Sequence, residues 1–111
     1  MNLSIHFDEP YIRREQISRL QPTDLNDFYV SASEVDRLNL FFVLLNTLHT
    51  LEQDGDPVLE AHLCFLLAYY LFVPLTPPGS CSLALHYIRQ AVTLHPLPEY
   101  REWLERMEQG N

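Results

Sequence analysis

The sequence is poor in glycine, in basic residues and in cysteine. Only 3 of its 111 residues are glycine while 8 are proline, so the prolines are expected to separate structural elements. Seven basic residues stand against 15 acidic ones, which gives a net charge of -8. Phosphates must be met by lysine or arginine, so this balance argues against binding to nucleic acid or to an anionic membrane surface. Two cysteines are too few for a disulfide framework.

The sequence also lacks a pattern for export and an apolar run long enough for a membrane span. Its first stretch, "MNLSIHFDEPYIRREQ", has no basic start followed by an apolar run. The apolar segment from Ala61 to Val73 is shorter than the roughly 20 residues that cross a bilayer, and Pro74 follows it. We therefore expect a cytoplasmic protein with reduced thiols, in which this segment is a buried helix or a contact surface.

The overall composition is that of a globular protein, because 47% of the residues are hydrophobic and 20% are charged. A chain of this length is expected to form a single domain, residues 1–111, with one core. The spacing of apolar residues predicts an all-α fold with five helices, at 9–20, 32–53, 57–73, 81–94 and 98–110. A polar connection is expected over 21–33. Short loops elsewhere predict a compact antiparallel bundle.

Capping residues and prolines suggest where the helices begin and end. "SEVD" (33–36) is typical of a capping box at the start of the long helix. The other expected signals are Asp56, and Ser80 or Ser82, as N-caps, and Pro74 and Gly110 as helix ends. Apolar residues lie all round the long helix, which predicts that it is central and covered on more than one side. They are Val35, Leu38, Leu40, Phe41, Phe42, Val43, Leu44, Leu45, Leu48 and Leu51.

"SLALHYIRQAVTLHP" (82–96) resembles the second helix of a tetratricopeptide repeat, with Ala84, Ile88, Ala91 and Pro96 at the family's spacing. The preceding helix, with its Leu67–Ala68 pair, fits the first-helix pattern in part. The resemblance covers about a third of the chain. It implies a helical hairpin that binds other proteins, usually through a concave face formed by first helices, and it implies no enzymatic activity.

Three groups of residues have the chemistry of a site without its spacing. His62, Cys64, Cys81 and His86 lack the two tight ligand pairs usual for zinc. "DGDPVLE" (54–60) does not follow the twelve-residue calcium pattern. The serines on either side of Cys81 lie near His86, but no strained elbow or glycine pattern marks an oxyanion site. No catalytic residue, metal site or cofactor is therefore predicted.

Two groups of residues are candidates for partner binding: Glu99, Glu102, Glu105, Tyr100 and Trp103 in the last helix, and Tyr69 and Tyr70 in the apolar segment. Glutamates at every third position share one face, and an acidic face edged by aromatic residues suits a basic protein. Alternatively, the aromatic residues pack inward and the glutamates are only solvated. Adjacent tyrosines cannot both face one core. One of them is therefore expected to line a groove or an oligomer contact, or to meet another helix.

Small size, acidity and the lack of catalytic residues favour a protein-binding function. The first hypothesis is an immunity-type inhibitor of the kind that bacteria use against basic toxin domains, since opposite charge speeds association. The alternative is a repeat-type chaperone of a secretion system, which shelters an apolar segment of its client in a helical groove. An enzyme would need a pocket where histidine and carboxylate side chains converge, and a structural subunit would need a large flat apolar patch. Self-association is compatible with either binding function.

Overall fold

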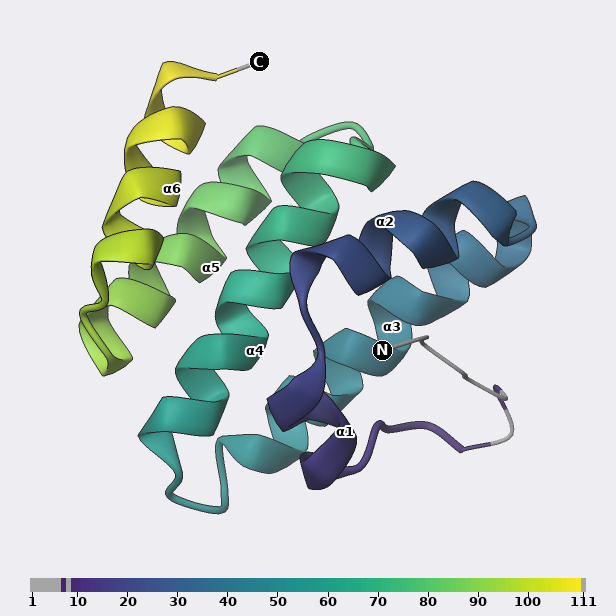
Figure 1. Cartoon of the computed structure of the whole chain (residues 1–111), viewed down its shortest axis with the longest axis horizontal. Helices are drawn as coiled ribbons and strands as arrows, with labels where there is room; N and C mark the ends of the chain where they lie inside the picture. Colours follow the sequence, from purple (N-terminus) through teal and green to yellow (C-terminus); the bar gives the residue numbers. More distant parts are fainter. Residues whose placement is uncertain (1–6, 8, 111) are drawn as a thin grey trace.

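A computed structural model describes Phe7 and residues 9–110, and these residues form an all-helical, compact fold (Figure 1). The radius of gyration is 13.0 Å, close to the ~13 Å typical of a compact domain of about 100 residues. Six α-helices and one π-helical turn follow one another along the described chain. They are α1 (Arg14–Arg19), α2 (Pro22–Ser31), α3 (Glu34–Leu51), α4 (Pro57–Tyr70), η1 (Leu71–Leu75), α5 (Ser80–Leu94) and α6 (Pro98–Gln109).

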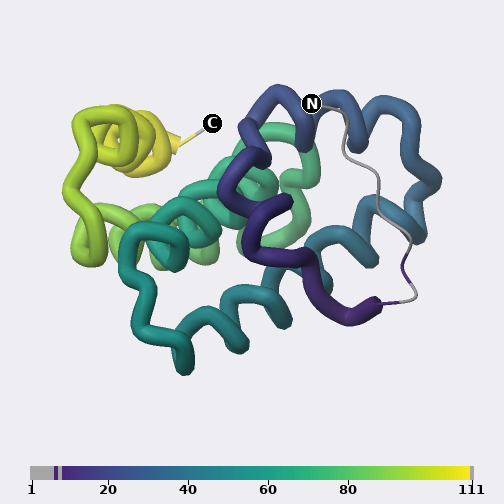
Figure 2. Tube along the Cα trace, turned by 60° about the horizontal axis from the view of Figure 1, so that its bottom comes forward, coloured from purple at the N-terminus to yellow at the C-terminus, as the bar shows by residue number. Residues whose placement is uncertain are grey.

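Helix α4 is the central element of the fold. It packs most extensively against α5, and also against α3, α1 and α2, while α6 packs on α5. The helices α4, α5 and α6 lie side by side, with α2 and α3 on the other side of α4 (Figures 1 and 2). Every residue from Leu63 to Phe72 is buried. The apolar segment of the sequence is therefore the core helix of this fold.

The stretch Pro57–Leu75 is the single helical segment within the described residues that is long and apolar enough to cross a membrane. The segment qualifies by its length and composition only, and 61% of its most apolar stretch is buried inside the protein. The buried core helix of a soluble protein meets the same criterion.

The start of α4 agrees with the sequence-based prediction, and its end differs from it. Asp56 is the N-cap, and its Oδ1 accepts a hydrogen bond from the Leu59 amide at 3.2 Å. The helix was expected to continue to Val73 and stop at Pro74, but the α-helical part ends at Tyr70 and a π-helical turn carries the chain through Pro74. Proline has no amide hydrogen to donate. The wider turn is closed instead by the Thr76 amide, which donates to the Leu71 carbonyl at 3.1 Å.

The prediction for the N-terminal third was wrong in one element and too long in another. The expected polar connection over 21–33 is largely a helix, α2, and α1 covers only Arg14–Arg19 instead of 9–20. Helix α2 begins with Pro22 in its first turn, and the Asp24 carboxylate accepts a hydrogen bond from the Gln21 amide at 2.9 Å. Its one fully buried apolar residue is Leu25. A helix with so narrow an apolar side leaves a weak periodic signal in the sequence.

Two helix starts test the predicted N-caps. At α3 the Ser33 hydroxyl accepts a hydrogen bond from the Asp36 amide at 3.2 Å, which confirms the expected cap. At α5 the prediction of a serine cap was wrong, since the N-cap is Gly79 and the helix already begins at Ser80. Gly79 has a φ of 82°, a left-handed conformation that glycine adopts at little cost. Gly110 stands at the end of α6, where a stop was expected.

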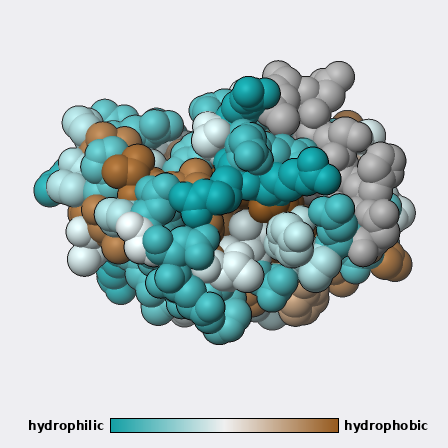
Figure 3. All heavy atoms as spheres, turned by 90° about the horizontal axis from the view of Figure 1, so that it is seen from below, coloured by the Kyte–Doolittle hydropathy of each residue, from teal (hydrophilic) through white to brown (hydrophobic). Residues whose placement is uncertain are grey.

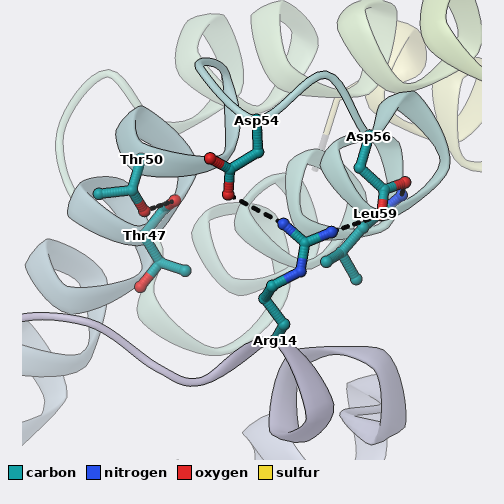
Figure 4. Close-up of polar contacts among 6 residues, drawn as sticks. All are labelled: Arg14, Thr47, Thr50, Asp54, Asp56 and Leu59. Atoms are coloured by element: carbon teal, nitrogen blue, oxygen red, sulfur yellow. Dashed lines mark hydrogen bonds and ion pairs between the residues drawn. The ribbon is translucent and has the colours of Figure 1, made fainter.

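An arginine connects α1 to the loop between α3 and α4. The two ends of the Arg14 guanidinium donate hydrogen bonds to Asp54 at 2.9 Å and to Asp56 at 2.7 Å (Figure 4). Asp56 thus uses one carboxylate oxygen to cap α4 and the other to hold α1. All three charged side chains remain between one third and one half exposed, so the arrangement stabilises the fold only modestly.

Candidate partner-binding surfaces

Helix α3 has two largely apolar faces, and the described residues fully cover only one of them. The inner face is buried where α3 packs on α4, through Leu40, Val43, Leu44, Thr47, Leu48 and Leu51. The other face, called the outer stripe below, consists of Val35, Leu38, Phe42, Leu45 and His49. Val35, Leu38 and Phe42 are 66%, 50% and 62% exposed. The prediction that α3 is central and covered on more than one side was therefore wrong.

The outer stripe has the spacing of a helix–helix contact. Its residues follow one another at alternating steps of three and four, the pattern that keeps one face of a helix against a partner helix over several turns. The described part of this chain supplies no such partner, because α3 makes its principal helix contact with α4 on the inner face.

A hollow of about 820 Å³ lies beside this stripe, between α3, α5 and the residues Phe7, Glu9 and Pro10, and is called the α3–α5 hollow below. Phe42 and Leu45 of α3 line it, with His86 and Tyr87 of α5 opposite. Phe7, Glu9 and Pro10 form a third wall. The chain that follows is fixed to α3 by the Asn46 side chain, which donates to the Pro10 carbonyl at 2.7 Å, and by the Ile12 amide, which donates to Thr47 Oγ1 at 2.9 Å.

A second hollow of about 450 Å³ adjoins the first along α5, and the two share His86 and Gln90 as lining residues. Glu60 of α4 and Leu94 near the end of α5 also line it. Both hollows are lined by apolar and polar residues together. The face seen in Figure 3 shows hydrophobic residues in small areas between hydrophilic ones.

The charges in the two hollows are mainly negative. Glu9 and Glu52 line the α3–α5 hollow, where Glu9 pairs with Arg13 at 3.9 Å, and Glu60 and Arg89 line the smaller hollow. Burial raises the pKa of Glu60, and the negative charge of Glu52 raises it further. The two carboxylates are therefore close enough to repel each other, and no ion pair joins either of them to a basic group within the described residues.

Cys64 lies beneath this acidic region and is not a nucleophile in this setting. It is fully buried, and its thiol donates to Gln90 Oε1 at 3.6 Å. Burial, followed by the charges of Glu60 and Glu52, raises the pKa of the Cys64 thiol to about 12. The reactive thiolate is thus scarce at neutral pH. Cys81, the other cysteine, is half-buried and also free.

The predicted acidic face exists on the surface of α6. Glu99, Glu102 and Glu105 are exposed, while Tyr100 and Met107 of the same helix are buried. Trp103 lies between the two sides, with Arg106 4.7 Å from its ring centre. The glutamates thus form a solvated face, and their part in binding stays a prediction.

The three tyrosines among the predicted binding residues lie in the core. Tyr69 packs edge-on against Trp103, with 5.3 Å between ring centres, and Tyr100 packs against Phe65 at 5.1 Å. Tyr70 is fully buried, and its hydroxyl donates to the Arg37 carbonyl at 2.6 Å. Their side chains are covered in this structure, so they would act on a partner only through the residues that they support.

Sequence reasoning did not identify the α3–α5 hollow, although the three-and-four spacing of the outer stripe was a usable signal. His62, Cys64, Cys81 and His86 do not form a metal-binding group: within the described residues no three histidine, cysteine or acidic side chains come together in that way. No family model, no curated protein and no solved structure matches the chain.

Proposed function

We propose that this protein binds a helical segment of another protein along the outer stripe of α3, in the α3–α5 hollow. The observation that carries the proposal is the exposure of Val35, Leu38 and Phe42 on a helix whose other face already forms the core. Apolar residues at helical spacing that the fold leaves uncovered are typical of an interaction site.

A helix is the segment that fits this surface. From Val35 to His49 the outer stripe spans about four turns, roughly 21 Å at 1.5 Å per residue. An amphipathic helix presents anchors at the same three-and-four spacing, so the two can interlock along that length. Phe7, Glu9, Pro10 and helix α5 supply side walls, which a flat contact surface would lack.

This function corresponds to a repeat-type chaperone for a client protein, acting in the cytoplasm without catalysis or cofactor. The α4–α5 pair supports a repeat-like hairpin, because the two helices form the most extensive contact of the fold and Ala84, Ile88 and Ala91 are all fully buried. Small residues at such positions allow close approach of neighbouring helices. The hollow lies beside this hairpin, and α5 is one of its walls.

The exposed glutamates of α6 favour a second candidate, an immunity-type inhibitor of a basic toxin domain. Glu99, Glu102 and Glu105 stand on one solvated face, opposite a buried side that fixes the helix. Such a face would attract a basic partner from a distance and would bind less strongly at high salt.

Capture with matched variants distinguishes the two candidates. Four baits are used on lysate of the source cells: the unmodified chain, Phe42→Asp, Glu102→Lys combined with Glu105→Lys, and a control. Val58→Asp is the control, since Val58 is an exposed apolar residue like Phe42, at 54%, but lies outside both hollows. Each captured protein is then purified and titrated calorimetrically against the four baits.

The groove proposal expects a partner that binds the unmodified chain and Val58→Asp equally and is lost with Phe42→Asp at both low and high salt. The inhibitor proposal expects the reverse: binding survives Phe42→Asp and is lost with the α6 reversals. A partner that tolerates Phe42→Asp would overturn the proposed groove.

A further inference from the structure

The charges around the α3–α5 hollow indicate what kind of helix it takes. Its lining includes two glutamates and no arginine, and the adjoining hollow adds Glu60. The chain contains no lysine at all, so arginine is its only basic residue besides histidine. A cation at this site must therefore come from an arginine of this chain or from a partner.

One arginine pairs at the hollow itself, because Arg13 lies 3.9 Å from Glu9, which lines it. The other paired arginines of the described residues have partners other than Glu52 and Glu60. Arg14 bridges Asp54 and Asp56, and Arg37 stacks on the Tyr29 ring at 4.0 Å. Arg89 lines the smaller hollow, but its charged end lies 4.0 Å from Glu108 of α6. Neither Glu52 nor Glu60 forms an ion pair with a basic side chain of the described residues, and the charge of Glu52 adds to the burial that raises the pKa of Glu60.

We propose that the occupant of the hollow is a basic amphipathic helix, whose apolar stripe lies on the outer stripe of α3 and whose lysine or arginine side chains meet Glu52 and Glu60. This inference rests on the proposed function. Glu52 lines the α3–α5 hollow and Glu60 lines the adjoining one, so the basic side chains of a helix bound there would interact favourably with both carboxylates. The apolar contact supplies area, and the charges select which helices bind.

A second copy of this chain fits the site less well. Two copies would each bring a net charge of -8, and the acidic rim of one hollow would approach that of the other. Repulsion between like charges opposes such a contact, whereas it promotes contact with a basic helix.

The test uses the full chain and three fluorescein-labelled helical peptides of about 18 residues, enough to cover the outer stripe. All three carry leucine at alternating three-and-four spacing. The flanking positions are lysine in the first peptide, glutamine in the second and glutamate in the third. Binding is measured by fluorescence anisotropy at low and at high salt.

Two double variants separate a local effect from a change in total charge. Glu52→Gln with Glu60→Gln removes two charges at the hollow, and Glu102→Gln with Glu105→Gln removes two on α6. Both reduce the net charge equally, and all four glutamates are at least partly exposed. Circular dichroism verifies that each variant keeps its helix content.

The proposal expects the lysine peptide to bind about tenfold or more tightly than the glutamine peptide at low salt, with the glutamate peptide weakest. It expects the hollow variant to lose most of that preference, about fivefold or more, and the α6 variant to retain it. Phe42→Asp should abolish binding of every peptide.

The other outcomes overturn the inference at identifiable levels. Equal binding of the lysine and glutamine peptides, with loss in Phe42→Asp, refutes the basic helix and leaves the groove function intact. An equal effect of both double variants assigns the preference to total charge and refutes the role of Glu52 and Glu60. Binding of none of the peptides refutes the groove function itself. Sedimentation showing a dimer that Phe42→Asp dissociates identifies the occupant as a second copy, which also overturns the inference.

Discussion

Two substitutions in the same helix separate the two faces of α3. Leu44 is fully buried on the inner face, whereas Phe42 on the outer stripe is 62% exposed. Truncating a buried leucine to alanine costs about 2–5 kcal/mol, because apolar contact is lost and a cavity remains. Burying a whole phenylalanine is worth about 1.5–3 kcal/mol, so the covered part of Phe42 contributes about 0.6–1.1 kcal/mol.

Leu44→Ala is therefore expected to destabilise the protein by about 2 kcal/mol more than Phe42→Ala. Urea unfolding followed by circular dichroism measures both, and unchanged denaturant slopes show that the comparison is valid. The phenylalanine variant should also lose partner binding while it stays folded. Equal destabilisation by the two substitutions would refute the reasoning, because it would mean that the outer stripe is part of the core.

Three further predictions concern the cap, the thiols and the buried tyrosine. Asp56→Ala should lower the free energy of unfolding in urea by about 1–2 kcal/mol, and Asp54→Ala by less than about 1 kcal/mol. Both aspartates pair with Arg14, but only Asp56 also caps a helix. Equal losses of stability would show that the cap is unimportant. At pH 8 a thiol reagent should modify Cys81 promptly and should not modify Cys64 until the protein unfolds, because burial raises the pKa of the Cys64 thiol to about 12. Rapid modification of both cysteines would contradict the packing of α4. Tyr70→Phe should lower the free energy of unfolding by about 1–1.5 kcal/mol, because the hydroxyl no longer donates to a main-chain carbonyl of α3. Unchanged stability of this variant would mean that the hydrogen bond does not form in solution.

The helices that sequence reasoning predicted well are those with strong local signals. Helix α4 is almost wholly apolar and begins at a capping aspartate followed by proline, so its position is evident without tertiary information. Helix α2 has a mostly polar surface and one fully buried leucine, Leu25. Its signal lies in the start "QPTD" (21–24), where proline occupies the first turn and Asp24 binds back to the first amide. Read as a cap, this stretch predicts the helix.

The burial of α3 could not be predicted because it depends on how many neighbours the fold supplies. Apolar residues surround this helix, and the sequence suggests cover on every side. Among the described elements, α4 makes the principal contact with it, and α4 takes the inner face. The outer stripe is the apolar face of α3 that remains exposed once α4 has packed against the inner face. Its position therefore emerges only from the three-dimensional arrangement.

The predicted binding residues fall into two groups: the tyrosines are buried and the glutamates are exposed. Adjacent tyrosines on a helix point in different directions, so one of them was expected to line a groove or an oligomer contact, or to meet another helix. Because α4 is central, the last alternative is the one observed: Tyr69 meets Trp103 of α6 and Tyr70 reaches the main chain of α3. The glutamates of α6 lie at the edge of the fold and remain exposed.

The outer stripe and the acidic composition make most sense together. An uncovered apolar stripe promotes self-association, and a net charge of -8 opposes it by keeping copies of the chain apart. The same charge attracts a basic helix to the hollow from a distance and then pairs with it at short range. A neutral protein with this stripe would be prone to aggregate, and an acidic protein without it would attract basic partners but have no apolar surface to hold them. The combination allows the surface to remain exposed until a complementary helix covers it.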